Sequence, residues 1–191
     1  MLRTVFLLVA LASTATASAE PTRFVALADI PYCAPAEVNP AFRTLIDTIN
    51  SRDPTFVLHL GDTKAGLIEC SDEILAEQLV FMNSFAAPVV YTPGDNEWVD
   101  CHRAPAGGYD PEERLDHIRD TYFAAPGRSL GGRPMDVDSQ PQLMPQHPQF
   151  VENVRFGPTC GHVRLCLWAY LGQAGFPSPF TFCGDRKPHS I

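Results

Sequence analysis

The stretch Thr55-Phe56-Val57-Leu58-His59-Leu60-Gly61-Asp62 decides the fold of this chain. A short, mainly apolar run that is closed by a Gly-Asp turn predicts a buried β-strand. Two other runs have the same form: residues 23–28 end at Asp29, and residues 88–92 end at Pro93-Gly94-Asp95. We therefore expect three strands that each end in an aspartate, and His59 is expected to be a histidine of the core.

Amphipathic helices are predicted between and after these strands. Asn39-Pro40 has the form of a helix start, and apolar residues follow it at the spacing of one helix face. Ser71 is the expected cap of a second helix, and Asp110-Pro111-Glu112-Glu113 opens a third. The β-α-β-α-β-α order predicts an α/β domain over residues 20–126, with a mostly parallel sheet covered by helices on both faces.

Composition narrows the class of protein. The chain has 191 residues, of which 45% are hydrophobic and 19% charged, so it is long and apolar enough to form a packed core. Its formal net charge is −8, which argues against a nucleic-acid binder and against attraction to an anionic membrane. A small anionic ligand is still compatible with this charge if metal ions supply the positive charge.

The N-terminus has the pattern of an export signal. Arg3 precedes the apolar run Val5–Ala12, which is far shorter than the roughly 20 residues of a membrane-spanning helix. Ala17-Ser18-Ala19 matches a cleavage site, so residues 1–19 are predicted to be a signal peptide. We expect a secreted or periplasmic protein that has no membrane segment after cleavage and whose cysteines meet an oxidising compartment.

The last third of the chain differs from the first two thirds. Residues 127–191 are rich in Pro and Gly, and 127–150 is predicted to be a loop or a disordered stretch. Only residues 161–170 have the pattern of a strand. The segment 127–191 is therefore predicted to be an irregular tail.

The three aspartates suggest a metal site. Ligands of parallel α/β sheets bind beyond the carboxyl ends of the strands, where Asp29, Asp62 and Asp95 are expected. Converging carboxylates repel one another, and divalent cations are the simplest compensation. The alternative is that each aspartate only caps a helix or forms a turn. Gly61 and Gly94 precede two of them and permit a tight turn and close backbone approach.

At these residues the sequence resembles the calcineurin-like metallophosphoesterase superfamily. The family carries D-x-H, G-D and G-N-H-[DE] after its first three strands; this chain has Asp29-Ile30-Pro31, Gly61-Asp62 and Gly94-Asp95-Asn96-Glu97. The runs Gly94–Trp98 and Asp100–Arg103 are similar to a divergent exported branch. The resemblance implies hydrolysis of a small-molecule phosphate ester with two divalent metal ions (Mn, Fe, Zn or Ca). Asp29 would bind the first metal, Asp62 would bridge both, and Asp95 would bind the second.

Departures from the family pattern change the expected chemistry. Pro31 has no ligand atom, so the first metal loses a nitrogen ligand. Asn96 stands where the family has its general-acid histidine, beside the second metal, and has no proton to transfer near neutral pH. His102 is then the candidate acid, with a surface loop residue as the alternative. Lys64 and Arg103 are candidates to offset the substrate phosphate, or are solvated loop charges.

The later histidine motifs of the family have no convincing counterpart. Gly161-His162-Val163-Arg164 has Arg where a second histidine is expected, and His147 and His189 lie in unsuitable surroundings. This loss predicts a truncated or frame-shifted product whose last ~30 residues are foreign to the family. Two other classes of function therefore stay open: a catalytically inactive fragment and a secreted binding module.

Six cysteines in an exported chain predict disulfides, although six allow fifteen pairings. Cys33, Cys70 and Cys101 each follow one of the aspartate-bearing strand ends, and Cys70–Cys101 is the preferred pair. Cys160, Cys166 and Cys183 lie in the tail. A Cys/His zinc site is disfavoured because the sequence contains no C-x-x-C.

Overall fold

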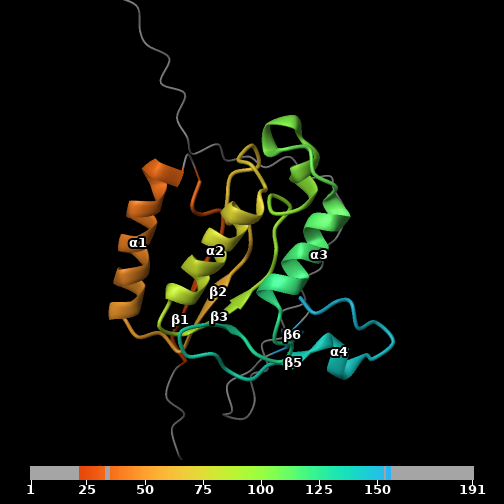
Figure 1. The fold of residues 1–191 in the computed structure, drawn as a ribbon. Helices are drawn as coiled ribbons and strands as arrows, with labels where there is room; N and C mark the ends of the chain where they lie inside the picture. The colour runs from red at the N-terminus through yellow and green to blue at the C-terminus, as the bar shows by residue number, and fades with distance from the viewer. Residues whose placement is uncertain (1–21, 33–34, 153, 156–191) are drawn as a thin grey trace, which may run out of the picture.

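The protein is described by a computed structural model that covers residues 22–32, 35–152 and 154–155 (Figure 1). Its elements are β1 (Phe24–Leu27), α1 (Pro35–Ser51), β2 (Phe56–His59), α2 (Asp72–Ser84), β3 (Pro88–Tyr91), the 3-10 helices η1 (Val99–His102) and η2 (Ala104–Ala106), α3 (Pro111–Tyr122), β4 (Leu130–Gly131), β5 (Asp138–Ser139), α4 (Gln140–Leu143) and β6 (Val154–Arg155). The predicted signal peptide and the predicted strand 161–170 lie outside the described residues.

The sheet confirms the α/β class. Its strand order is β1-β2-β3-β4; the first three strands are parallel, and β4 pairs antiparallel with β3. A second, two-stranded sheet joins β5 and β6. Part of the segment 127–150, predicted as a loop, therefore forms regular structure. Each element in it is only two to four residues long, which is too short to produce a readable period.

The three long helices lie on one face of the sheet, which corrects the expected cover on both faces (Figure 1). One core cluster joins side chains of α1, α2 and α3 to Val57, Val89 and Tyr91 of the sheet. The other face, with Phe56, Leu58 and Val90, packs against Met135, Val137 and Val154. The reason lies in the strand order, which runs 1-2-3 without reversal. Right-handed crossovers in one direction place their helices on the same side.

The helix starts are confirmed for α2 and α3 and wrong for α1. Ser71 Oγ accepts the Ile74 N–H at 3.4 Å, and Asp110 Oδ1 accepts the N–H groups of Glu112 and Glu113 at 2.8 and 3.1 Å. Helix α1 begins at Pro35, so Pro40 lies inside it. Asn39 is therefore no cap. Its side chain instead donates to Glu77 Oε1 on α2 at 2.8 Å and so joins the two helices.

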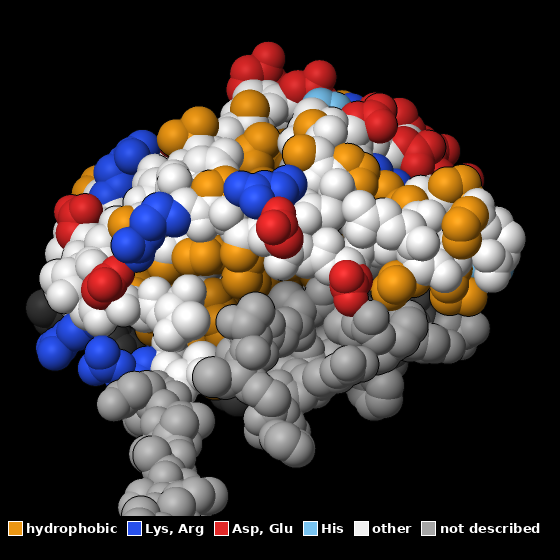
Figure 2. All heavy atoms as spheres, turned by 90° about the horizontal axis from the view of Figure 1, so that it is seen from below, with side chains coloured by type: hydrophobic (Ala, Val, Ile, Leu, Met, Phe, Trp, Pro, Cys, Tyr) orange, Lys and Arg blue, Asp and Glu red, His pale blue; other side chains and the backbone are white. Residues whose placement is uncertain are grey.

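The end of the sheet opposite the aspartates is seen from below in Figure 2. Hydrophobic side chains lie on this face among both basic and acidic ones. Phe24 at the β1 edge is 48% exposed and stacks on Phe56 with ring centroids 5.0 Å apart. Among the described residues, no helix is long and apolar enough to cross a membrane.

Candidate functional site

The loops that follow β1, β2 and β3 lie side by side at the carboxyl end of the sheet. The Asp29 N–H donates to Gly61 O at 3.2 Å, and the Thr92 N–H donates to His59 O at 3.0 Å, so the parallel pairing continues past the strand ends. Asp29 and Asp62 both have left-handed backbone, with φ of 58° and 55°. Aspartate tolerates this conformation better than most residues. The same local geometry therefore presents both carboxylates.

Two glycines allow the second and third loops to touch. A Cβ on Gly61 would lie 2.2 Å from the Gly94 nitrogen, and a Cβ on Gly94 would lie 2.0 Å from Asp62 Oδ1. Gly61 also has a φ of +85°, which a side chain would disfavour. The expected close backbone approach at these glycines is confirmed.

His59 is a buried residue of the core, as expected. Its side chain is 0% exposed, and its Nδ1 accepts the Gly61 N–H at 3.3 Å. Burial lowers the pKa of His59 to about 4, against a smaller opposing effect of the Ile30 carbonyl. His59 is therefore neutral and helps to shape the turn that presents Asp62.

The hydroxyl of Tyr32 lies between the first two aspartates. Tyr32 Oη is 3.1 Å from Asp29 Oδ1 and 3.2 Å from Asp62 Oδ2, and it accepts a hydrogen bond of 2.8 Å from Asn96 Nδ2. Burial and the charges of Asp62 and Asp29 raise its pKa, so it is a neutral phenol. Sequence reasoning did not identify this residue, although its place directly after the Pro31 that interrupts the D-x-H pattern was visible.

Asn96 connects the three loops. Its backbone N–H donates to Asp62 Oδ1 at 3.2 Å, and its side-chain Nδ2 donates to Lys64 O at 3.0 Å as well as to Tyr32. Its Oδ1 faces Gly66, where an added Cβ would lie 2.8 Å away. The amide therefore presents hydrogens, and not its oxygen, to Tyr32.

The electrostatics of the site centre on Asp62. Its pKa is raised to about 7, chiefly by burial, then by the charge of Glu97 and, to a smaller extent, by those of Asp95 and Asp29. The Asn96 N–H opposes this shift. A carboxyl group that is half-protonated near neutral pH among other acids is poorly compensated by the surrounding protein.

Asp95 is the least involved of the three aspartates. Its side chain is exposed and makes no hydrogen bond to another described residue, whereas its backbone carbonyl accepts the N–H groups of Trp98 and Asp100 at 3.3 and 2.9 Å. Asp95 is near enough to raise the pKa values of Asp62 and Asp100. The structure thus brings Asp29 and Asp62 to one hydroxyl and leaves Asp95 at the margin.

Glu97 joins the loop after β2 to the loop after β3. It is 0% exposed, and its carboxylate accepts the backbone N–H groups of Asp62 at 3.2 Å, Gly94 at 3.0 Å and Thr63. Burial raises its pKa, while the Thr63 N–H lowers it. Sequence reasoning quoted Glu97 as part of a motif but assigned it no role. This clamp fixes the backbone that presents Asp62.

The Glu97→Gln variant is expected to lose about 2 kcal/mol of unfolding free energy, because an amide group has one acceptor oxygen for three backbone donors. Urea denaturation measures this loss. Glu73→Gln, on the exposed first turn of α2, is the matched control and is expected to change stability by less than about 0.5 kcal/mol. Equal stability of the two variants would contradict the clamp.

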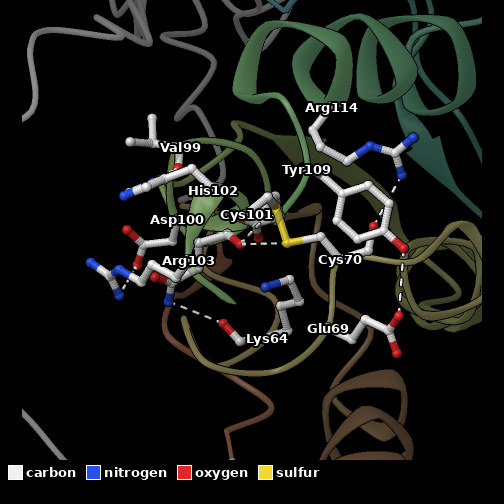
Figure 3. Close-up of a disulfide and its surroundings, with 12 residues drawn as sticks. Lys64, Glu69, Cys70, Val99, Asp100, Cys101, His102, Arg103, Tyr109 and Arg114 are labelled. Carbon is white, nitrogen blue, oxygen red and sulfur yellow. Dashed lines mark hydrogen bonds and ion pairs between the residues drawn. A yellow bond between two sulfur atoms is a disulfide. The ribbon is translucent and has the colours of Figure 1, made fainter. Parts of the chain in front are cut away.

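Of the two residues that are candidates to offset a phosphate, Lys64 is buried and Arg103 is partly exposed. Lys64 is 2% exposed, and its Nζ donates to Ile68 O at 2.9 Å, so it faces the inside of its own loop (Figure 3). Burial lowers its pKa. The side chain of Arg103 is 44% exposed, and its Nη1 pairs with Asp100 Oδ2 at 2.6 Å. Of the two, only Arg103 has a guanidinium or ammonium group open to an approaching anion.

His102 lies on the same 3-10 helix as Asp100. Its ring is exposed, and Nδ1 lies 2.7 Å from Val99 O (Figure 3). Among the hydrogen bonds of the described residues, none joins His102 to Asp29, Asp62 or Asn96. Its role as an acid stays a prediction.

The preferred Cys70–Cys101 pair is in place as a disulfide (Figure 3), with an S–S distance of 1.96 Å. Both cysteines are 0% exposed, and their Sγ atoms lie 3.7 and 3.8 Å from Asn96 O. The bond joins the loop after β2 to η1 directly behind Asn96. Cys33, Cys160, Cys166 and Cys183 lie outside the described residues.

The chemistry of the donor atoms decides which metals fit. Within the described residues, no group of three or more His, Cys, Asp or Glu side chains is placed to hold a metal ion. A donor atom of another residue type, the phenol oxygen of Tyr32, lies beside both Asp29 and Asp62. This set consists of oxygen atoms, which suit hard cations such as Ca²⁺, Mg²⁺ or Mn²⁺ better than Zn²⁺.

Comparison of the chain with protein-family models, curated proteins and solved structures gave no match. The functional conclusion therefore rests on the geometry of this site and on the motifs in the sequence.

Proposed function

We propose that this protein is an exported, metal-dependent phosphoesterase. The observation that carries the proposal is the contact of one hydroxyl, that of Tyr32, with both Asp29 and Asp62. This hydroxyl brings together two carboxylates from different strand ends, at the carboxyl end of the sheet, where α/β proteins bind their ligands. Burial, and then the charge of Glu97, raise the pKa of Asp62, so positive charge beside these carboxylates would favour its ionised form.

Divalent metal ions supply that charge and polarise the phosphoryl group. Asp29 would hold the first cation, Asp62 would serve both, and Asp95, at the margin of this pair, would be a ligand of the second. The oxygen donors favour Mn²⁺ or Ca²⁺ over Zn²⁺ and Fe²⁺. Asn96 orients the Asp62 side chain through its backbone N–H, and the Glu97 carboxylate holds the backbone of the loop after β2 by accepting the Asp62 N–H.

The residues proposed to meet the substrate are His102, the last residue of η1, and Arg103, which follows it. Arg103 is partly exposed and already binds one carboxylate, so its guanidinium is suited to a second anion such as a phosphate monoester. His102, its neighbour, is the group proposed to donate a proton to the leaving oxygen. Lys64 is withdrawn from this role because its ammonium group is buried in its own loop.

A second function, metal binding without hydrolysis, is favoured by a specific observation. Among the described residues, no histidine is hydrogen-bonded to the side chain of Asp29 or Asp62, and His147 lies against Phe150 with ring centroids 5.9 Å apart. A shell without histidine holds a cation but has fewer ligands to position a substrate.

Hydrolysis of p-nitrophenyl phosphate distinguishes the two functions. We expect no product after EDTA treatment and measurable release of p-nitrophenol when Mn²⁺ is restored, with a smaller effect of Zn²⁺. If Mn²⁺ raises the melting temperature but no product forms, binding without hydrolysis is the function. If Mn²⁺ changes neither quantity, both functions are wrong.

A further inference from the structure

We propose that Tyr32 is itself a ligand of the cation, with its phenol oxygen in the place of the histidine that Pro31 removes from the D-x-H pattern. The inference rests on the proposed metal site. It adds a residue that the sequence motifs do not include, and it assigns the selectivity of the first position to oxygen donors alone.

The hydrogen count at Tyr32 Oη is the first reason. The hydroxyl carries one hydrogen and accepts another from Asn96 Nδ2 at 2.8 Å. Two carboxylate oxygens nevertheless lie 3.1 and 3.2 Å from it. The single hydroxyl hydrogen serves only one of them. The other contact places two oxygen atoms together without a hydrogen of Tyr32 between them, so either a proton on the carboxyl group or a cation must fill it, and a bound cation takes the place of that proton.

The way in which Tyr32 is held is the second reason. Asn96 Nδ2 is itself anchored to Lys64 O at 3.0 Å, and the Asn96 N–H binds Asp62 Oδ1 at 3.2 Å. The same residue therefore fixes the phenol oxygen and the carboxylate next to it. The preceding Pro31 is buried, so the backbone that leads into Tyr32 is held in place as well. A preorganised oxygen of this kind is characteristic of ligands and their supporting residues.

The sign of a mutational effect separates a ligand from a space-filling group. If the hydroxyl only filled the gap between the carboxylates, an incoming cation would have to displace it, and its removal would tighten binding. If the oxygen is a ligand, its removal weakens binding. Tyr32→Phe removes the oxygen and keeps the ring.

The experiment titrates MnCl₂ into the EDTA-treated, dialysed full chain by calorimetry, for the wild type, Tyr32→Phe and Tyr109→Phe. Tyr109 is the matched control, because its hydroxyl contacts Glu69 at 3.5 Å on the other side of the disulfide (Figure 3). We expect the Kd for Mn²⁺ to rise about 10-fold or more in Tyr32→Phe and to stay unchanged in Tyr109→Phe. The near-ultraviolet difference spectrum that Mn²⁺ produces from tyrosine is expected to vanish only in Tyr32→Phe.

The outcomes are distinct. An unchanged or lower Kd in Tyr32→Phe, or a difference spectrum that persists in it, overturns the ligand role and leaves the proposed function standing. A wild-type protein that binds no Mn²⁺ overturns the proposed function and the ligand role together. Circular dichroism and the melting temperature of the metal-free variants show whether Tyr32→Phe is folded. The difference spectrum is read only from protein that is folded.

Discussion

Replacing Asp62 by Asn is expected to lower Mn²⁺-dependent hydrolysis of p-nitrophenyl phosphate by at least about 100-fold, the scale of losing one essential electrostatic contact in an active site. Asp62 is the only one of the three aspartates that is both in contact with Tyr32 and bound by the Asn96 N–H. An amide keeps the shape of the side chain but removes the charge that holds the cations. Asp47→Asn, on the exposed face of α1, is the control and is expected to keep full activity.

The same variant tests the charge cluster without any substrate. The pKa of Asp62 is raised from 3.8 to about 7 in the folded protein. Its neutral form is therefore favoured by folding, so wild-type stability falls as the pH rises from about 4 to about 7. The amide introduced by Asp62→Asn does not ionise. The metal-free variant is therefore expected to gain about 2 kcal/mol over the wild type between these pH values, a figure reduced for the partial exposure of the group.

Urea denaturation in EDTA at pH 4 and pH 7 measures the difference between the two proteins. A difference that does not change with pH would contradict the carboxylate cluster. Retained hydrolysis in Asp62→Asn would instead contradict the metal site. The stability measurement therefore tests the carboxylate cluster, and the hydrolysis measurement tests the metal site.

Removing the Cys70–Cys101 disulfide is expected to cost about 3 to 4 kcal/mol of unfolding free energy. The two cysteines are 31 residues apart in sequence, and a cross-link over a loop of this length restricts the unfolded chain by about that amount. The Cys70→Ser/Cys101→Ser double variant is compared with the wild type by denaturation with and without dithiothreitol.

Dithiothreitol is the internal control of this comparison. It should bring the wild type close to the double variant and leave the double variant almost unchanged. The loss should also weaken Mn²⁺ binding, because both Sγ atoms lie against Asn96 O. If the free energy of unfolding of the wild type is the same with and without dithiothreitol, the two cysteines are not cross-linked.

Sequence patterns predicted the parts of the fold that follow from local chemistry. The strand-end turns at Asp29 and Asp62 and the caps at Ser71 and Asp110 each depend on residues within a few positions, and each is present. The start of α1 was predicted wrongly because Asn39 has a partner, Glu77, 38 residues away. A capping preference is a local rule and does not include such a contact.

The site shows the same division. The approach of Gly61 and Gly94 was expected from their place in the two turns. Lys64 was a candidate to offset a phosphate or a solvated loop charge, but the direction of a long side chain depends on its own loop, and here the Ile68 carbonyl accepts a hydrogen bond from the ammonium group. Tyr32 and Glu97 were missed because their importance arises from contacts with residues 30 to 64 positions away along the chain.

The contact between Gly61 and Gly94 has an evolutionary consequence. A methyl group on Gly61 would overlap the backbone of Gly94, and one on Gly94 would overlap Asp62, so neither glycine can take a side chain while the opposing turn keeps its place. Substitutions there act non-additively, as expected for residues in direct contact. In descendants of this chain we therefore expect a side chain at either glycine only together with a change in the opposing turn.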